Sequence, residues 1–271
     1  MADALTFSPL ASRALIAVSG PDWRGFLQGL ITQDVETLKP GEVRFGALLT
    51  PQGRLLHDLF VIGRDDGCWL DVAAEHRAAI LQRLLMYRLR AKVEIATDDA
   101  AVAAAFGAGT PGEGFAVDPR VPELGWRGYG VPVSGDEAAY NAHVLALGLP
   151  APADWGSDRT YPIEANFDLV NGIDFHKGCY VGQETTSRMK RRGQIKNRML
   201  PVVFEGPAPS PGAEILVGDL RAGEVLCGAN GRAMALVRLD RIEGAALSVD
   251  GRPVRIERPA WLSAALGEEV A

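Results

Sequence analysis

Hydrophobic positions divide the first sixty residues into a strand, a helix and a hairpin. Residues 13–19 form an apolar run that predicts a strand ended by Gly20-Pro21-Asp22. Asp22 is placed to cap a helix. The apolar face of that helix comprises Trp23, Phe26, Leu27, Leu30 and Ile31. Strands are predicted at 43–50 and 54–62, with Thr50-Pro51-Gln52-Gly53 as the turn of a hairpin.

A second strand and helix follow. Residues 68–73 predict a strand, and 75–90 predict an amphipathic helix. Its inward residues are expected to be Ile80, Leu81, Leu84, Leu85 and Leu89. Residues 92–95 predict the next strand. Strands joined by hairpins and mixed with helices indicate an α+β domain rather than a doubly wound parallel sheet.

After Leu200 the pattern changes to short apolar runs separated by Gly, Pro and Asp. The runs lie at 201–204, 214–217, 223–227, 233–239, 246–249 and 254–257. Such spacing predicts a small antiparallel barrel or sandwich. We therefore expect two domains, at 1–197 and 198–271.

Composition excludes several classes of protein. The 271 residues are 47% hydrophobic, which suits an ordinary globular fold, and the net charge of −6 argues against a general nucleic-acid binder. The three cysteines, Cys68, Cys179 and Cys227, show no CxxC spacing, so neither a zinc site nor a disulfide framework is expected. Neither a secretory signal nor an apolar run long enough for a membrane span is evident, and the prediction is a cytoplasmic protein.

Residues 176–193 carry the strongest chemical signal. Cys179 stands between Gly178 and Gly182, ahead of a helix predicted to run to Arg192 and to stop at Gly193. A thiol just before a helix N-terminus is shifted toward thiolate, and a nearby Lys177 ammonium would act in the same direction. Two interpretations stay open, a reactive thiol and a small buried hydrophobe.

The string Lys177–Glu184 resembles the signature of the YgfZ/IBA57 family, folate-binding relatives of the aminomethyltransferase (T-protein) of the glycine cleavage system. Residues 25–35, 46–58, 161–166 and 258–262 are similar to further family segments. The resemblance implies a T-protein-like fold, with ferredoxin-like subdomains in a ring around a central cavity and a C-terminal β-barrel. It also implies tetrahydrofolate, or a one-carbon derivative, as ligand.

The resemblance implies a role in iron–sulfur cluster assembly or repair, with an indirect effect on tRNA-modifying iron–sulfur enzymes. Partners would be the assembly machinery or client enzymes. The residues expected to act are Cys179, Lys177 and Asp58. The residues expected to bind folate are Gln28, Asp58, Glu164, Asn166, Lys177, Tyr180, Gln183 and Glu184. Glu164 and Asn166 are equally suited to cap a turn.

Two departures from the transferase relatives weaken the case for their chemistry. Their hairpin carries an Asp-Asp pair, where this chain has His57-Asp58. Their pterin-holding glutamate is missing from the corresponding segment, 125–129. The alternatives are therefore a folate-dependent aminomethyl transferase with Asp58 as acid or base, and a non-catalytic interaction or RNA-binding module. How Cys179 acts stays open among redox chemistry, cluster contact and nucleophilic attack.

A basic segment follows the signature. Arg188, Lys190, Arg191 and Arg192 lie at the end of the predicted helix. One interpretation is a solvated helix end whose charges offset the dipole. The other is an anion site, for the glutamate tail of folate or for RNA phosphates. RNA is the weaker alternative, because no series of aromatic residues accompanies the cations.

Overall fold

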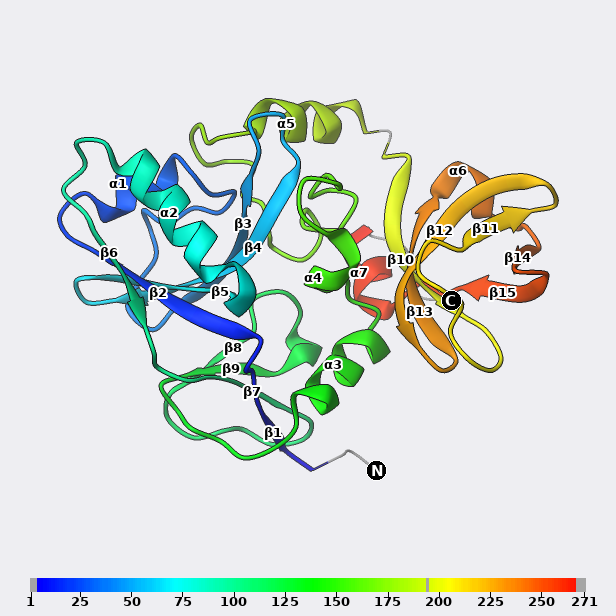
Figure 1. Cartoon of the computed structure of the whole chain (residues 1–271), viewed down its shortest axis with the longest axis horizontal. Helices are drawn as coiled ribbons and strands as arrows, with labels where there is room; N and C mark the ends of the chain where they lie inside the picture. Colours follow the sequence, from blue (N-terminus) through cyan, green and yellow to red (C-terminus); the bar gives the residue numbers. More distant parts are fainter. Residues whose placement is uncertain (1–3, 194, 267–271) are drawn as a thin grey trace.

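Three groups of antiparallel strands make up the computed structural model, which describes residues 4–193 and 195–266 (Figure 1). A five-stranded sheet has the order β3-β4-β5-β2-β6, and a four-stranded sheet has the order β1-β7-β9-β8. The remaining strands close a barrel in the order β10-β13-β12-β11-β14-β15. The predicted α+β class and the C-terminal barrel are confirmed.

The central strands of the five-stranded sheet are buried on both faces. Its strands are β2 (Arg13–Ser19), β3 (Val43–Leu49), β4 (Leu55–Arg64), β5 (Gly67–Ala73) and β6 (Glu94–Asp98). Successive residues of a strand point to opposite faces. Leu59 and Val61 accordingly join the core under the helices, whereas Phe60 and Ile62 join the core shared with the second sheet and the barrel.

The two helices on this sheet are shorter than predicted. Helix α1 (Trp23–Gln28) ends before Leu30 and Ile31, and the Asp22 carboxylate accepts from the Lys92 amide instead of capping α1. A 3₁₀ turn, η1 (Ala74–His76), precedes α2 (Arg77–Arg88). Leu89 was predicted to point inward but is 88% exposed, because α2 stops at Arg88 and Leu89 takes a φ of 44°.

The four-stranded sheet packs between the first sheet and helix α3. Its elements are β1 (Thr6–Pro9), β7 (Val102–Phe106), β8 (Phe115–Val117), η2 (Pro122–Leu124), β9 (Trp126–Tyr129) and α3 (Glu137–Ala146). The Asp136 side chain accepts from the Ala138 amide and so caps α3. The sheet thereby brings Arg127, on β9, against β5 of the first sheet.

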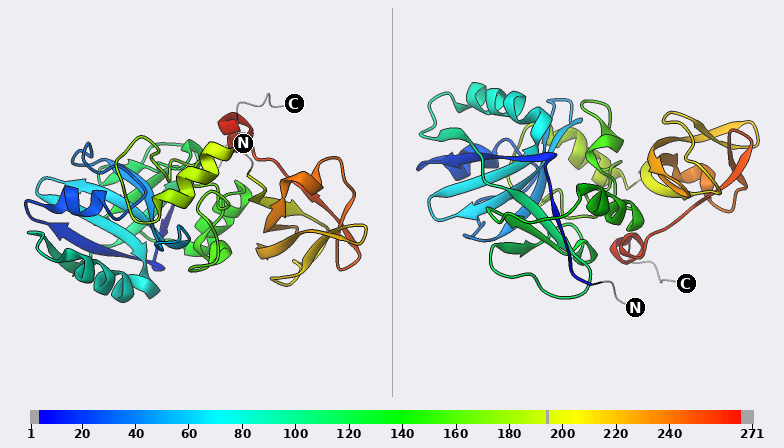
Figure 2. Two further views of the ribbon diagram at one scale, coloured as in Figure 1. Left: turned by 90° about the horizontal axis from the view of Figure 1, so that it is seen from above. Right: turned by 60° about the horizontal axis from the view of Figure 1, so that its bottom comes forward.

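The chain between α3 and the barrel holds α4 (Pro152–Trp155), a series of turns and α5 (Gln183–Arg192). The predicted stop is confirmed, since Gly193 caps α5 with a φ of 66°. Helix α5 lies at the end of the molecule reached by the β3–β4 hairpin (Figure 1), and the left view of Figure 2 shows it on the surface between the sheets and the barrel.

The C-terminal strands close into a barrel. Its elements are β10 (Asn197–Val203), β11 (Glu214–Val217), β12 (Leu220–Ala229), β13 (Arg232–Arg238), α6 (Leu239–Ile242), β14 (Leu247–Val249) and β15 (Arg252–Ile256). Helix α7 (Ala260–Leu266) returns to the first region, where the Trp261 indole donates to the Leu147 carbonyl at 2.8 Å. Strand β10 begins at Asn197, at the end of the first predicted domain.

Candidate functional site

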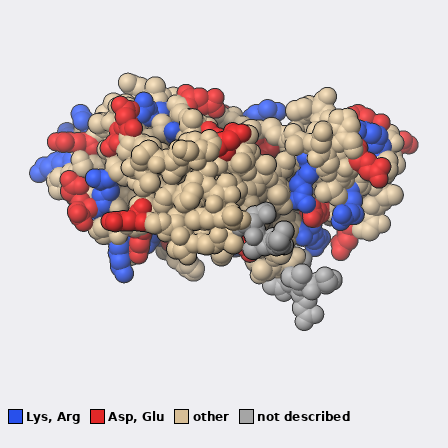
Figure 3. All heavy atoms as spheres, turned by 90° about the horizontal axis from the view of Figure 1, so that it is seen from below, with Lys and Arg blue, Asp and Glu red and all other residues tan. Residues whose placement is uncertain are grey.

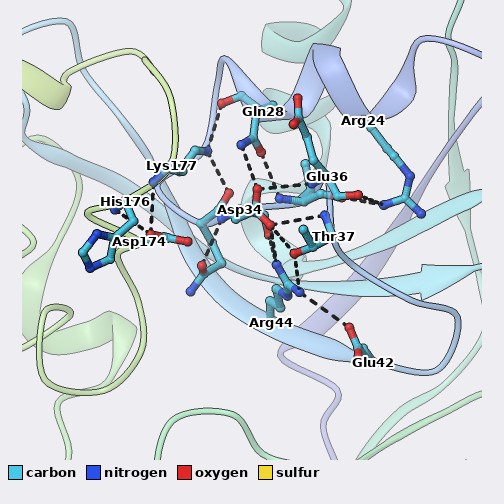
Figure 4. A network of polar contacts seen from close by, with 12 residues as sticks. Arg24, Gln28, Asp34, Glu36, Thr37, Glu42, Arg44, Asp174, His176 and Lys177 are labelled. Carbon is cyan, nitrogen blue, oxygen red and sulfur yellow. Dashed lines mark hydrogen bonds and ion pairs between the residues drawn. The ribbon is translucent and has the colours of Figure 1, made fainter.

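Lys177 binds the loop that follows helix α1. Its Nζ donates to the carbonyl oxygens of Gln28, Ile31 and Gln33, at 2.9, 2.7 and 2.8 Å (Figure 4). Partial burial lowers the pKa of Lys177 to about 8, against the opposing effect of Asp34 and Asp174. The ammonium therefore ties the signature segment to the first sheet.

Gln28 and Asp34 form a second layer behind Lys177. The Gln28 amide donates to Asp34 at 2.8 Å and its oxygen accepts from the Val35 amide, so both ends of this side chain are engaged (Figure 4). Burial alone would raise the pKa of Asp34, but hydrogen bonds from Thr37, Gln28 and Arg44 hold it well below its usual range. Gln28 was predicted to bind folate, but its side chain is used to hold the loop that contains Asp34 and Val35.

Cys179 is the exposed thiol of the three. It lies just ahead of α5, as predicted, on a loop whose next residues are anchored: Tyr180 is 7% exposed and the Val181 amide donates to Gly29. The charge of Lys177 is directed to backbone carbonyls. Burial raises the pKa of Cys68 far above its usual value and also raises that of Cys227, where Asp154 adds to the effect.

Tyr180, Gln183 and Glu184 line an open hollow of about 780 Å³ between the signature loop and α5. Phe175, Lys190 and Arg191 form other parts of its wall. Burial raises the pKa of Tyr180 to about 12. The predicted anion-binding residues Arg188, Lys190, Arg191 and Arg192 are all exposed along this helix.

Glu164 and Asn166 join the turns before the signature to the barrel. Glu164 accepts from the Tyr161 amide and from the Asn197 side chain, both at 3.0 Å. Asn166 is fully buried, donates to the Met199 carbonyl and accepts from Arg198. The capping alternative fits Glu164, whereas the Asn166 side chain bonds the barrel strand β10. Neither side chain lines the hollow at α5 or the larger cavity described next.

Asp58 lines a separate cavity of about 1010 Å³, enclosed by β4, α3, α4 and β12. His57, Asp58, Asp154, Trp155 and Cys227 are among the residues that line it. Asp58 is 5% exposed and binds Arg13 at 2.9 Å. Burial, with the neighbouring His76, lowers the pKa of His57 to about 4, and its buried Nδ1 has no hydrogen-bond partner in the described chain.

A buried ionic cluster stands behind this cavity. Asp71, on β5, accepts from Arg13 and Arg127, and Asp118 pairs with Arg120. Arg127 is 2% exposed and its guanidinium lies 3.8 Å from the Phe60 ring centroid. In the segment 125–129, which corresponds to the pterin-holding segment of the transferases, the Arg127 side chain therefore lies between the two sheets.

The predicted site residues thus fall into four places, one of which is the junction of Glu164 and Asn166 with the barrel. Cys179, Tyr180, Gln183 and Glu184 belong to the face at α5, Lys177 and Gln28 to the contacts beneath it, and Asp58 to the large cavity. Asp154, Trp155 and Cys227 were not predicted as cavity residues, because only the packing of α4 against β4 and β12 brings them to the same cavity as His57. No local motif marks them.

Two family models match separate parts of the chain. The model described as the GCVT N-terminal domain matches residues 10–109, and that of the CAF17 C-terminal beta-barrel domain matches residues 196–264. The human protein named iron-sulfur cluster assembly factor IBA57, mitochondrial, is 30% identical over 282 residues, which cover 87% of this chain and 78% of the human one. The chain belongs to the YgfZ/IBA57 family.

The members compared differ in length. The Neurospora crassa relative, an IBA57 homolog with the same description, is 35% identical over 238 residues, but these cover 74% of this chain and 54% of the fungal one. The chain thus spans little more than half of that relative. The crystal structure of glycine cleavage system aminomethyltransferase T from Bartonella henselae superposes with a TM-score of 0.73 at 16% identity, covering 95% of this chain and 86% of that one, which shows the fold.

The predicted cytoplasmic location was wrong, because the curated relatives are named as mitochondrial proteins. That prediction rested on unpaired cysteines and on the lack of a secretory signal, and neither distinguishes one reducing compartment from another. As for membranes, the helices of the described residues include none with the length and apolar content to cross one.

Proposed function

We propose that this protein acts in iron–sulfur cluster assembly or repair, and that Cys179 is its point of contact with the cluster. The family carries the first part, since its curated members are named assembly factors. The cluster contact is assigned to Cys179 because its side chain is exposed on an anchored loop. Of the three cysteines, Cys68 is buried and Cys227 lines the large cavity.

The cluster contact we propose is a shared one. An iron–sulfur cluster is held by about four ligands, usually cysteine thiolates. Among the described residues no group of three or more His, Cys, Asp or Glu side chains is arranged to hold a metal ion. Cys179 would therefore lose its proton and bind one iron while a partner protein supplies the other thiolates. Effects on tRNA-modifying enzymes would follow through their clusters.

Tetrahydrofolate is the small molecule we propose for the large cavity. Pockets that bind small organic ligands have volumes of about 300–1,000 Å³. The volume of this cavity, about 1010 Å³, is large enough for a folate. The unpartnered Nδ1 of His57 and the carboxylate of Asp58 would bind polar edges of the pterin, and Trp155 would contribute apolar wall. When bound, the folate would supply a reduced pterin able to carry one carbon.

The geometry supports aminomethyl transfer less well. Asp58, its expected acid or base, is held by the Arg13 guanidinium at 2.9 Å. The contact engages Oδ2, one of the two oxygens with which this carboxylate could act on a substrate. Likeness to a transferase at 16% identity extends to the fold alone.

Two measurements test the proposal separately. Calorimetric titration with tetrahydrofolate should give saturable heat with the wild type, unchanged in Cys179→Ala and weakened at least tenfold in His57→Ala. Absence of heat would remove folate from the proposal. Rescue of a strain lacking this protein, read as iron–sulfur enzyme activity, should fail with Cys179→Ser and succeed with Cys227→Ser. Full rescue by Cys179→Ser would show that the Cys179 thiol is not needed for cluster assembly.

A further inference from the structure

Helix α5 carries cations that no carboxylate neutralises. Among the described residues, Arg188, Lys190, Arg191 and Arg192 are not within ion-pair distance of any Asp or Glu. Several arginines elsewhere are paired with carboxylates, buried or exposed. Examples are Arg13, Arg44, Arg77, Arg120, Arg127, Arg198, Arg221, Arg232 and Arg238. On the face seen from below, positive and negative side chains are interspersed (Figure 3).

The helix dipole does not explain all of this charge. Cations in the last turn stabilise a helix by about 0.3–1 kcal/mol each, and Lys190, Arg191 and Arg192 lie there. Arg188 precedes that turn. Arg188 also lies one turn from Arg191 and Arg192, and like charges at these spacings repel each other, so the group of cations stabilises the isolated chain little. The arrangement suits a binding surface better than a helix end.

The hollow beside α5 gives this charge a place to act. Lys190 and Arg191 form part of its wall, together with Gln183 and Ser187. Lys190 Nζ lies 5.2 Å from the Phe175 ring centroid, which places the ammonium over an apolar wall. The hollow of about 780 Å³ is open to solvent and lies next to the loop that carries Cys179.

We infer that this face, defined by α5 and its hollow, docks an acidic polypeptide segment of the protein that shares a cluster with Cys179. The inference rests on the proposed function for the identity of that partner. Charge complementarity supplies orientation and a faster encounter, as between other oppositely charged surfaces. A carboxylate-bearing segment lying along α5 would bring its own thiolates to the exposed Cys179 without burying a large apolar area.

A nucleic acid fits this face less well than an acidic peptide. Single strands bind through exposed aromatic rings on which bases stack. Of the aromatic residues in the hollow, Tyr180 is buried and Phe175 is half-buried beneath Lys190.

The test is fluorescence anisotropy with a labelled octaglutamate peptide at low salt, using the full chain. Lys190→Glu/Arg191→Glu should weaken binding at least tenfold. The matched control Arg88→Glu/Arg90→Glu changes net charge equally at exposed positions near the end of α2, and it should change binding less than twofold. Equal losses in both variants, or no binding by the wild type, would overturn the inference.

Two further probes separate the alternatives. The first probe is a labelled oligouridine. If it binds more tightly than the peptide, and the α5 variant loses this binding, the ligand of this face is RNA and not an acidic polypeptide. Cys179→Ala should bind the peptide as the wild type does. If that variant also rescues iron–sulfur enzyme activity, the proposed thiol role fails while docking stands. If Cys179→Ala fails to rescue but the α5 variant binds normally, docking alone fails.

Discussion

Gly53 and Gly182 lie in direct backbone contact. A Cβ on Gly53 would come 2.9 Å from the Gly182 carbonyl oxygen, and a Cβ on Gly182 would come 3.0 Å from the Gly53 Cα and 2.5 Å from the Thr50 oxygen. The contact joins the turn of the β3–β4 hairpin to the start of α5. The strand that carries Asp58 and the loop that carries Cys179 are therefore fixed relative to each other.

Gly53→Ala should destabilise the protein more than an ordinary glycine substitution. Both Gly53 and the control Gly41 have positive φ, at 84° and 80°, but a Cβ on Gly41 meets nothing within 4 Å. A side chain at such φ costs about 1–2 kcal/mol. The clash should add about 1–3 kcal/mol for Gly53→Ala. Urea unfolding of both variants measures the difference, and equal losses would contradict a role for the contact.

Lys177→Met should loosen the signature loop. The change removes three charge-assisted hydrogen bonds and leaves the carbonyls of Gln28, Ile31 and Gln33 without that donor. We expect a loss of about 2–3 kcal/mol in the free energy of unfolding. Lys39→Met, at an exposed position, is the matched control and should change it by less than about 0.5 kcal/mol. Hydrogen exchange should rise at the Val181 amide, and unchanged exchange there would contradict the role.

Asp71→Asn should be the most damaging of the carboxylate changes. Burial would raise the pKa of Asp71, but Arg127 and Arg13 lower it, so the carboxylate is charged in the fold. Removing that charge leaves Arg13 with Asp58 alone and Arg127 with only the more distant Asp118, at 3.7 Å, for a cost of about 3–5 kcal/mol. Asp99→Asn, where the side chain is 90% exposed beside Arg77, should cost less than about 1 kcal/mol. Thermal and urea unfolding compare the two, and similar values would contradict the assignment.

Local patterns predicted the fold far better than the site. The barrel strands followed from apolar runs between Gly, Pro and Asp turns, and the end of α5 from Gly193, since these signals act over a few residues. The prediction that Leu89 points inward was wrong, because the helical spacing of apolar residues continues in the sequence past the residue at which the helix ends. The partners of Lys177 lie 144 to 149 residues away, and Arg127 meets Asp71 across 56 residues. Such contacts depend on how the sheets pack, which a single sequence does not encode locally.

His57 should make the protein less stable in acid. Its pKa of about 4 in the fold lies below the ordinary value of 6.5, so between these values the unfolded chain binds more protons than the folded one. Stability is therefore lost as the pH falls from about 6.5 to about 4, and this contribution becomes constant below that. His57→Asn should flatten this part of the profile of unfolding free energy against pH. His176→Asn, at an exposed position, serves as control and should leave it as steep as in the wild type. A slope that is the same in wild type and His57→Asn would show that burial in the cavity does not hold the imidazole neutral.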